Sequence, residues 1–365
     1  MTTDIWHYPR TTLAEQVLQL FEIGISSALI FFAPRRMGKT EFLRKDIEPL
    51  ASDKGWQTFY FSFLDVGEKA LEEFTKELAS FTQKTDTIYS KTGRLLKRVK
   101  KISGQAAGVK AEIELNNPHA IDHNLKSLIS RLATRNKILL LLDEVQILAQ
   151  RSTNTQFIAA LRTTLDIHKD NVKVIFTGSS REGLRRMFSQ ANAPFFHFGQ
   201  NLPFPELGHG FTDHLSDIFK KVTGRKLNKE ELWNNFQSMQ KVPQLARALV
   251  ERIALNPALT LAEAKEQLIT EIIDDRTFIG SWQNCTTLEQ LLLQEIAVGI
   301  TALFSEETRN RLGSKLGINK LAVSSIQSSV RSLQRKGLIG RLPERGGYFI
   351  DDPNFESWLR QSRYE

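Results

Sequence analysis

The chain is poor in cysteine and has no long apolar run, and both absences narrow the class of protein to which it can belong. Cys285 is the single cysteine among 365 residues. An internal disulfide framework is therefore excluded, and a reducing compartment such as the cytoplasm is expected. No stretch reaches the ~18 consecutive apolar residues that suggest a membrane-spanning helix. The first ten residues lack a basic start followed by an apolar segment, so no secretory signal is expected.

Acidic residues are scarce in two segments, and these segments carry much of the positive charge. The sequence has 49 basic and 41 acidic residues, a net charge of +8. Residues 87–110 contain seven basic residues and no acidic one, and residues 309–365 contain 11 basic and five acidic residues. Such local excess favours a polyanionic partner. Solvated surface is the alternative for each segment.

The length of the chain and its hydrophobic patterning predict two or three domains. Strand-like apolar runs alternate with helical patterns in the first half, which indicates a parallel sheet with helices on both faces. The expected strands are residues 27–32, 58–63, 138–142 and 172–177, with a helix at 71–81 and an apolar segment at 195–198. The predicted domains are a core over residues 1–205 with a hairpin-bearing insertion at about 82–120, a helical lid over 206–280, and a third domain over 285–365.

The first expected strand leads into a loop with the pattern of a phosphate-binding loop (P-loop). The loop consists of Ala33, Pro34, Arg35, Arg36, Met37, Gly38, Lys39 and Thr40, and Glu41 follows it. The loop matches G-x-x-x-x-G-K-[ST] except that Ala33 replaces the first glycine. Gly38 lets the backbone approach a phosphate closely, Lys39 is suited to neutralise the β- and γ-phosphates, and Thr40 to hold Mg²⁺. We predict that ATP or GTP binds here with magnesium.

A second motif lies about a hundred residues downstream, where the apolar run 138–142 ends in Asp143 and Glu144. Such a run is typical of a central strand that is buried on both faces. At its end, Asp143 is predicted to reach Mg²⁺, directly or through water. Glu144 is predicted to orient and deprotonate the attacking water. The alternative for this acidic pair is a helix N-cap.

The next strand ends in further polar candidates, Thr177, Ser179 and Ser180. A polar residue at this tip can contact the γ-phosphate or the water, and Ser179 is the preferred candidate. The alternative is turn chemistry and helix capping.

Three arginines are candidates for contact with nucleotide phosphates. Arg247 lies one turn into a helix that opens at Val242-Pro243, where it can act from the lid. Arg185 and Arg186 can act as arginine fingers toward a neighbouring subunit, or they can be ordinary surface arginines.

Four features resemble the archaeal-type ATPases of the AAA+/STAND superfamily. They are the Pro-Arg-Arg-x-Gly-Lys-Thr loop, the Asp-Glu pair, the Thr-Gly-Ser-Ser tip, and Tyr348-Phe-Ile-Asp-Asp-Pro353 with Trp358-Leu359. The resemblance implies a sheet of order 5-1-4-3-2, a helical lid, a C-terminal winged helix, and Arg10 near the adenine. The chain departs from the family at Gln200, where arginine is usual, and at Lys241, where glycine is usual. Both departures favour slow turnover and a switch rather than a motor.

The C-terminal segment has the pattern of three helices followed by a strand pair, which predicts a winged helix. The expected helices are residues 288–304, 306–316 and 320–336. The third carries apolar residues on one face, and Arg331 and Arg335 face away. These two arginines, and Arg345 in the wing, are predicted to contact duplex DNA. The alternative is a winged helix that binds protein or packs against the ATPase.

The leading hypothesis is an ATP-driven switch that associates with DNA. One alternative is a STAND-like signalling or antiviral-defence ATPase whose winged helix binds a partner effector protein. Another is an assembly ATPase for a transposase or nuclease of a mobile element. A nucleotide-dependent oligomer is compatible with each.

Overall fold

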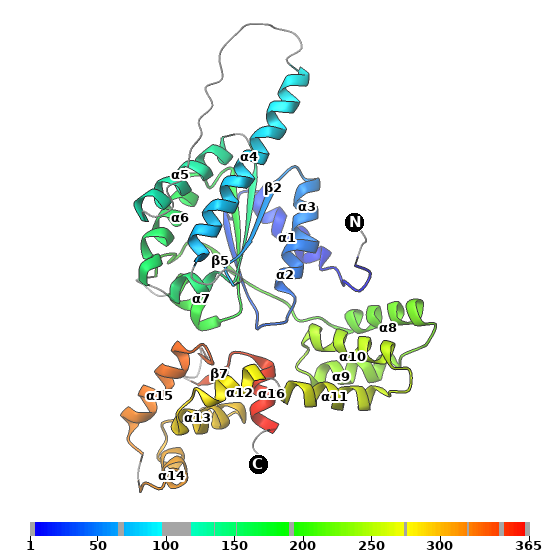
Figure 1. Cartoon of the computed structure of the whole chain (residues 1–365), viewed down its shortest axis with the longest axis vertical. Helices are drawn as coiled ribbons and strands as arrows, with labels where there is room; N and C mark the ends of the chain where they lie inside the picture. The colour runs from blue at the N-terminus through cyan, green and yellow to red at the C-terminus, as the bar shows by residue number, and fades with distance from the viewer. Residues whose placement is uncertain are drawn as a thin grey trace.

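The computed structural model describes residues 4–64, 69–96, 118–134, 136–150, 152–189, 193–273, 276–319, 321–342 and 347–361. They form an upper α/β core, a helical lid at one side, and a C-terminal domain below the core (Figure 1). None of the helices described combines the length and the apolar composition that a membrane crossing requires.

A five-stranded parallel sheet forms the centre of the core. Its strands are β1 (Ala28–Phe32), β2 (Gln57–Ser62), β3 (Ile138–Asp143), β4 (Val172–Gly178) and β5 (Gln200–Pro203). Their spatial order is β2-β3-β4-β1-β5, which is the predicted order 5-1-4-3-2 seen from the other edge. In this register Leu140 pairs with Phe59 on one side and with Val174 on the other. The predicted α/β fold is therefore confirmed.

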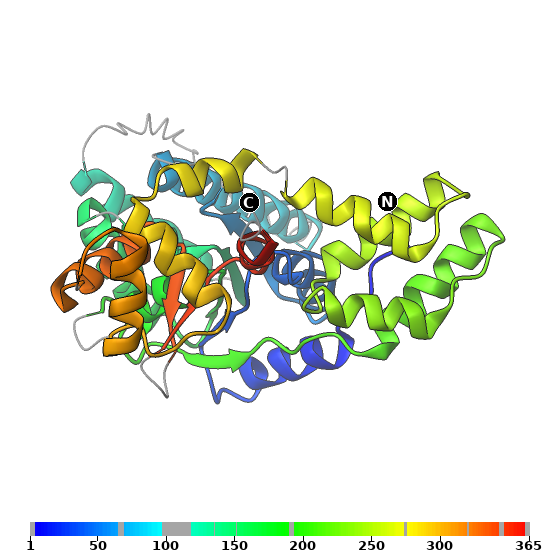
Figure 2. The same ribbon diagram turned by 90° about the horizontal axis from the view of Figure 1, so that it is seen from below.

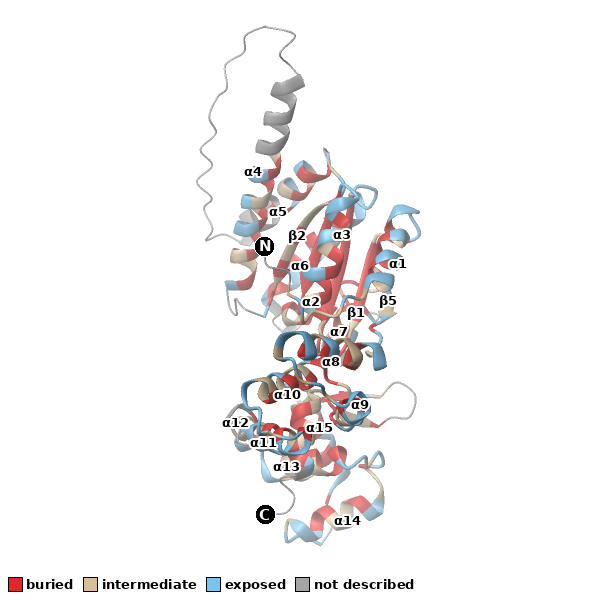
Figure 3. Cartoon of the chain, turned by 90° about the vertical axis from the view of Figure 1, so that its right-hand side faces the viewer, coloured by how far each residue is buried: buried red, intermediate tan, exposed pale blue. Residues whose placement is uncertain are grey.

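Helices cover both faces of the sheet, which explains why β3 is apolar at every position before its final aspartate (Figure 3). Leu139 and Leu141 pack in one core cluster, and Leu140 and Leu142 pack in the other. The helices of the core domain are α1 (Thr11–Glu22), α2 (Lys39–Glu41), α3 (Glu48–Asp53), α4 (Ala70–Leu96), α5 (Pro118–Ala133), α6 (Thr155–Ile167) and α7 (Arg181–Phe188). The shorter turns are the π-helical η1 (Phe42–Ile47) and the 3₁₀ turns η3 (Val145–Gln150) and η4 (Ser152–Asn154).

One expectation for the core needs correction, and one apolar segment can now be assigned. The helix expected at 71–81 continues to Leu96 and so covers the first part of the expected insertion at about 82–120. Residues 97–117, on which the expected hairpin falls, lie outside the described residues, and α5 begins at Pro118. The apolar segment at 195–198 is a turn, and the strand follows at Gln200–Pro203. The reason is aromatic packing, since the rings of Phe195 and Phe198 lie against Phe176 rather than in the sheet.

The lid and the C-terminal domain lie side by side below the core (Figure 2). The lid comprises α8 (His209–Thr223), α9 (Lys229–Ser238), α10 (Pro243–Leu255) and α11 (Leu261–Ile273). The C-terminal domain comprises α12 (Arg276–Gln283), α13 (Thr287–Ala297), α14 (Glu306–Lys315), α15 (Val323–Arg335), β6 (Ile339–Arg341), β7 (Tyr348–Ile350) and α16 (Pro353–Gln361). Strands β6 and β7 pair antiparallel. Helix α13 stops well before the expected residue 304, because Gly299 has a φ of +87° and leaves the helical conformation.

Candidate functional site

The P-loop lies between β1 and α2, at the carboxyl edge of the sheet. Gly38 has a φ of +89°, a left-handed conformation that favours glycine, and nothing lies within 4 Å of where its Cβ would be. Helix α2 begins directly after it, at Lys39. The loop backbone therefore curls around open space in front of a helix N-terminus, an arrangement suited to binding an anion.

Lys39 lies inside this loop with only 5% of its surface exposed. Its Nζ donates to the carbonyl oxygens of Ala33 (2.6 Å) and Pro34 (2.9 Å), and lies 4.0 Å from Oε1 of Glu144. Burial lowers the pKa of Lys39, although the carboxylates of Glu144 and Asp143 act in the opposite direction. A phosphate in the loop would supply the negative charge that this buried ammonium favours.

Asp143 is the centre of a hydrogen-bond cluster at the end of β3. Its Oδ2 accepts from Thr40 Oγ1 at 2.5 Å and from Tyr60 OH at 3.2 Å. Its Oδ1 accepts from Thr177 Oγ1 and from the backbone N–H of Glu144. The structure thus brings Thr40 and Asp143 together as the sequence predicted. Tyr60 was not foreseen, because its closeness depends on β2 lying beside β3.

Glu144 is held by residues from two separate elements. Its φ of +54° is unusual for a residue with a side chain. Oε2 of Glu144 accepts from Ser179 Oγ at 2.6 Å and from Gln146 Nε2 at 2.5 Å. Glu144 is therefore bonded to the tip of β4, a contact that the sequence did not predict, and Gln146 was likewise not singled out from the sequence.

The three polar candidates after β4 have different contacts. Thr177 bonds to Asp143 and Ser179 bonds to Glu144. Ser180 caps helix α7, because its Oγ accepts from the backbone N–H of Gly183 at 3.1 Å. The capping alternative therefore describes Ser180, and the preferred candidate Ser179 lies beside the acidic pair.

Arg247 reaches toward the same site from α10 of the lid. Its guanidinium lies 3.3 Å from Glu41 Oε1 and 3.6 Å from Asp4 Oδ2. Lys241, at the position where the resemblance expects glycine, has a φ of +52°, the left-handed conformation that favours glycine.

Arg10 lies where the N-terminal segment meets the loop and the lid. Its guanidinium donates to the carbonyl oxygens of Pro205 (2.5 Å) and Met37 (3.4 Å) and stacks over the Phe204 ring. With Arg247 it lines a small hollow beside the P-loop. The structure thus places Arg10 beside the P-loop and the lid, and its predicted position near the adenine stays a prediction.

A charged cluster fastens the N-terminal segment to the helix after the P-loop. His7 Nε2 lies 2.6 Å from Asp46 Oδ1, and His7 Nδ1 lies 3.6 Å from Glu41 Oε2. Burial alone would lower the pKa of His7, but the two carboxylates outweigh it and raise that pKa to about 9. The hydrogen bond from His7, with help from Lys45, lowers the pKa of Glu41 to about 2.

A cavity of about 680 Å³ lies against Lys39, Thr40, Asp143, Glu144 and Arg247. This volume is within the range of small-molecule sites, roughly 300–1,000 Å³. The P-loop, the strands β2 and β3, and the lid all contribute residues to its wall. The lining residues are Arg35, Arg36, Gly38, Lys39, Thr40, Glu41, Tyr60, Ser62, Leu64, Asp143, Glu144, Pro243, Gln244, Arg247, Ala248 and Glu251.

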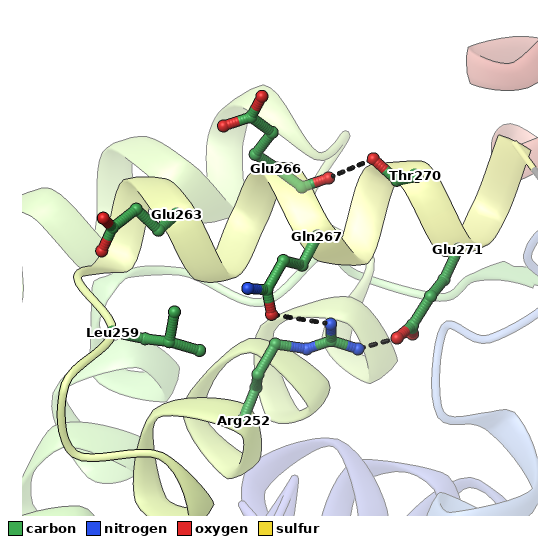
Figure 4. A pocket seen from close by; sticks show the side chains of 7 residues that line it. All are labelled: Arg252, Leu259, Glu263, Glu266, Gln267, Thr270 and Glu271. Atoms are coloured by element: carbon green, nitrogen blue, oxygen red, sulfur yellow. Dashed lines mark hydrogen bonds and ion pairs between the residues drawn. The ribbon is translucent and has the colours of Figure 1, made fainter.

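A second hollow, of about 560 Å³, lies on the lid between α10 and α11 (Figure 4). Its single arginine, Arg252, is engaged by Gln267 and Glu271, the latter at 2.5 Å. Glu263 and Glu266 also line it. This surplus of carboxylates would repel phosphate, so the hollow is unsuited to a nucleotide.

The residues that the sequence predicts to contact nucleic acid are distant in sequence from the residues that line the cavity. Arg331 and Arg335 are exposed on the outward face of α15, whose opposite face buries Ile326, Val330 and Leu333. Arg345 lies outside the described residues. Arg185 and Arg186 belong to α7 and are not among the residues that line the cavity.

Comparison with known proteins identifies the family. The Walker-type ATPase paby2304 of Pyrococcus abyssi superposes with a TM-score of 0.68 and 15% identity, over 98% of this chain and 99% of that chain. The ORC2 protein of Aeropyrum pernix, in its ADPNP-ADP complexes, gives a TM-score of 0.57 and 14% identity, over 96% and 91%. No curated protein sequence matches the chain. Residues 10–236 match the family described as an ATPase domain predominantly from Archaea, so the chain is an ATPase and belongs to that family.

Proposed function

We propose that the cavity binds ATP with Mg²⁺, and that Glu144 acts as the general base in hydrolysis. The observation that supports this most is the convergence of Lys39, Thr40, Asp143 and Glu144 on one cavity. Water attacks the γ-phosphorus, the bond from that phosphorus to the β–γ bridging oxygen breaks, and ADP and inorganic phosphate leave. Glu144 takes the proton of the attacking water.

Lys39 supplies the positive charge for the phosphates. Its Nζ now bonds to two carbonyls of its own loop, at 2.6 and 2.9 Å. An incoming phosphate offers a charged acceptor, and charge-assisted hydrogen bonds are about twice as strong as neutral ones. We propose that Lys39 exchanges the carbonyls for the β- and γ-phosphates while the loop backbone surrounds them.

The residues at the end of β3 fit magnesium. Thr40 and Asp143 present hard oxygen ligands 2.5 Å apart at the cavity wall. Mg²⁺ is usually held by one or two carboxylates together with substrate phosphates and water. Bound Mg²⁺ would neutralise charge that develops on the phosphates.

Three further residues are proposed to contact the nucleotide. Arg247, now paired with Glu41 and Asp4, is proposed to turn toward the γ-phosphate when the lid closes. Arg10 is proposed to lie beside the adenine of the nucleotide, in the hollow between the N-terminal segment and the lid. Ser179 is proposed to act near the attacking water, because its hydroxyl bonds to Glu144.

Replacement of Glu144 by glutamine tests the proposed base. The amide keeps the shape of the side chain but cannot take a proton. We expect ATP affinity to stay at the wild-type level and kcat to fall on the order of 10²-fold or more. Calorimetry and steady-state phosphate release measure the two quantities. Unchanged turnover would mean that another residue activates the water.

We further propose that the C-terminal domain is a winged helix that binds duplex DNA and that ATP controls this association. Three helices, α13 to α15, precede the antiparallel pair β6–β7 in the order that a winged helix requires. The outward face of α15 carries Ser324, Ser328, Arg331 and Arg335, all exposed. Serine and arginine are suited to phosphates and base edges.

Fluorescence anisotropy with a labelled duplex tests the DNA proposal. The full chain should bind at low salt, and binding should weaken as salt rises, because each neutralised phosphate releases a counterion. Measurements with ATP, with ADP and without nucleotide show whether the bound nucleotide changes the affinity for DNA. An absence of binding at low salt in all three would reject the DNA proposal and favour a winged helix that contacts a protein.

A further inference from the structure

Gln146 lies beside the proposed general base, Glu144. It belongs to η3, directly after β3, and is 5% exposed. Its Nε2 donates to Glu144 Oε2 at 2.5 Å and lies 3.5 Å from Ser179 Oγ. Gln146 is therefore in direct contact with both residues that the proposed reaction uses at this end of the cavity.

The surroundings of Gln146 leave space for its side chain and for little else. A Cβ at Gly178 would collide with Gln146 Oε1, and a Cβ at Gly183 would lie 2.7 Å from Gln146 Cβ. Two glycines on different elements therefore make room for this one side chain.

Packing alone does not require an amide group at position 146. Its Oε1 is buried and has no hydrogen-bond partner among the residues that the structure describes. An unsatisfied buried polar atom costs roughly 1–3 kcal/mol. An apolar side chain of similar length would fill the same space without this cost. The favourable contacts that only the amide provides are the short bond from Nε2 to Glu144 and the long one to Ser179 Oγ.

We infer that Gln146 is a positioning residue for hydrolysis. Together with Ser179 it holds Oε2 of Glu144. The other oxygen, Oε1, then faces Lys39 Nζ at 4.0 Å, the side from which the phosphates enter. This inference rests on the proposed role of Glu144 as general base.

Three hydrogen bonds to one oxygen, from Gln146 Nε2 and from the hydroxyl and backbone N–H of Ser179, restrict the freedom that a glutamate side chain otherwise has. A misplacement of about 1 Å can cost roughly 10²-fold in rate, so an orientation held in advance has a large kinetic value. The donors also leave Oε1 available for water, since all three bonds are to Oε2. Binding of ATP does not require this orientation, because the phosphates contact the loop rather than Gln146.

The test is the Gln146→Met variant, which keeps the length of the side chain and removes the donor. We expect kcat to fall about tenfold or more, since a general base contributes roughly 10²–10⁴-fold and loses part of that when misoriented. KM and the ATP affinity should stay at the wild-type level. Thermal melting should show equal or higher stability, because the unsatisfied oxygen is gone. Gln156→Met, at an exposed position of α6, is the matched control and should be unchanged.

A double-mutant cycle separates positioning from a purely structural role. If Gln146 acts through Glu144, adding Gln146→Met to Glu144→Gln should not lower kcat further, because residues that act as a unit are non-additive. An independent structural defect would multiply with the first loss and would contradict the inference. If the methionine variant does not fold, Gln146→Glu provides a second variant of the same shape. Its carboxylate would repel Glu144, and it should show the same loss.

The remaining outcomes distinguish the two proposals. If Glu144→Gln hydrolyses ATP at the wild-type rate, the proposed general base is wrong. If Glu144→Gln is slow but both Gln146 variants retain full kcat, only the inference on Gln146 fails. A rise in kcat for Gln146→Met would show that Gln146 holds Glu144 away from the water, and would also overturn the inference.

Discussion

The carboxyl edge of the sheet and the outward face of α15 hold their polar side chains in opposite ways. At the sheet edge, Lys39, Asp143 and Ser179 are each at most 5% exposed and are bonded to other residues of the site. On α15, Arg331 and Arg335 are exposed above an apolar face.

The difference separates the proposed site of hydrolysis from the proposed DNA-binding face. Buried polar groups share hydrogen bonds, so a change in one residue alters the position or charge of the next. Exposed arginines contribute little to the stability of the fold, and their removal usually changes the free energy of unfolding by less than about 0.5 kcal/mol. Substitutions at the sheet edge should therefore have large and coupled effects, and substitutions on α15 small and independent ones.

The largest effect is expected for Lys39→Ala. The variant removes the buried positive charge at the phosphates, and ATP affinity should fall by at least about 10²-fold, corresponding to roughly 2.7 kcal/mol. Isothermal calorimetry with magnesium measures it. Lys173→Ala is a matched control, because Lys173 on β4 is also a buried lysine whose pKa burial lowers. Wild-type affinity in Lys39→Ala would refute the assignment of the phosphate loop.

A moderate effect is expected for the double variant Arg331→Ala with Arg335→Ala. DNA affinity should fall, and the slope of log affinity against log salt should become shallower by up to about two units. ATP hydrolysis should be unchanged, since α15 belongs to a different domain. Lys220→Ala with Lys221→Ala removes the same charge from exposed positions of α8 and should leave the slope as it is. Full retention of DNA binding by the arginine variant would remove α15 from the interface.

The smallest effect is expected at the edge of the nucleotide site, where His7 is bonded to Asp46 and Glu41. Its pKa is raised from 6.5 to about 9, so the stability it contributes is fully present below about pH 6.5 and lost as pH rises through about 9. Thermal melting between pH 6 and 10, as a difference between wild type and His7→Gln, measures this contribution. The difference should shrink toward alkaline pH. A difference that does not vary with pH would contradict the raised pKa.

Most of the nucleotide site could be predicted from local sequence patterns. The P-loop and the Asp143-Glu144 pair each combine an apolar strand with polar residues at its end, and both signals lie within a few consecutive residues. The parallel sheet then brings the ends of β1 and β3 to the same edge. By contrast, the apolar segment at 195–198 did not reveal that β5 begins only at Gln200, because aromatic rings that pack in a turn have the same apolar pattern as a strand.

The sequence by itself determined that a phosphate-binding loop, a buried strand and an acidic pair exist, because each depends on neighbours along the chain. Only the tertiary structure decided which side chains meet. Tyr60 reaches Asp143 across 83 positions, and Ser179 joins Gln146 at Glu144 across more than 30. The N-terminal cluster of His7 with Asp46 likewise spans 39 positions. Such contacts depend on strand order and on the conformation of single residues, such as the left-handed backbone of Glu144, which no periodicity in the sequence records.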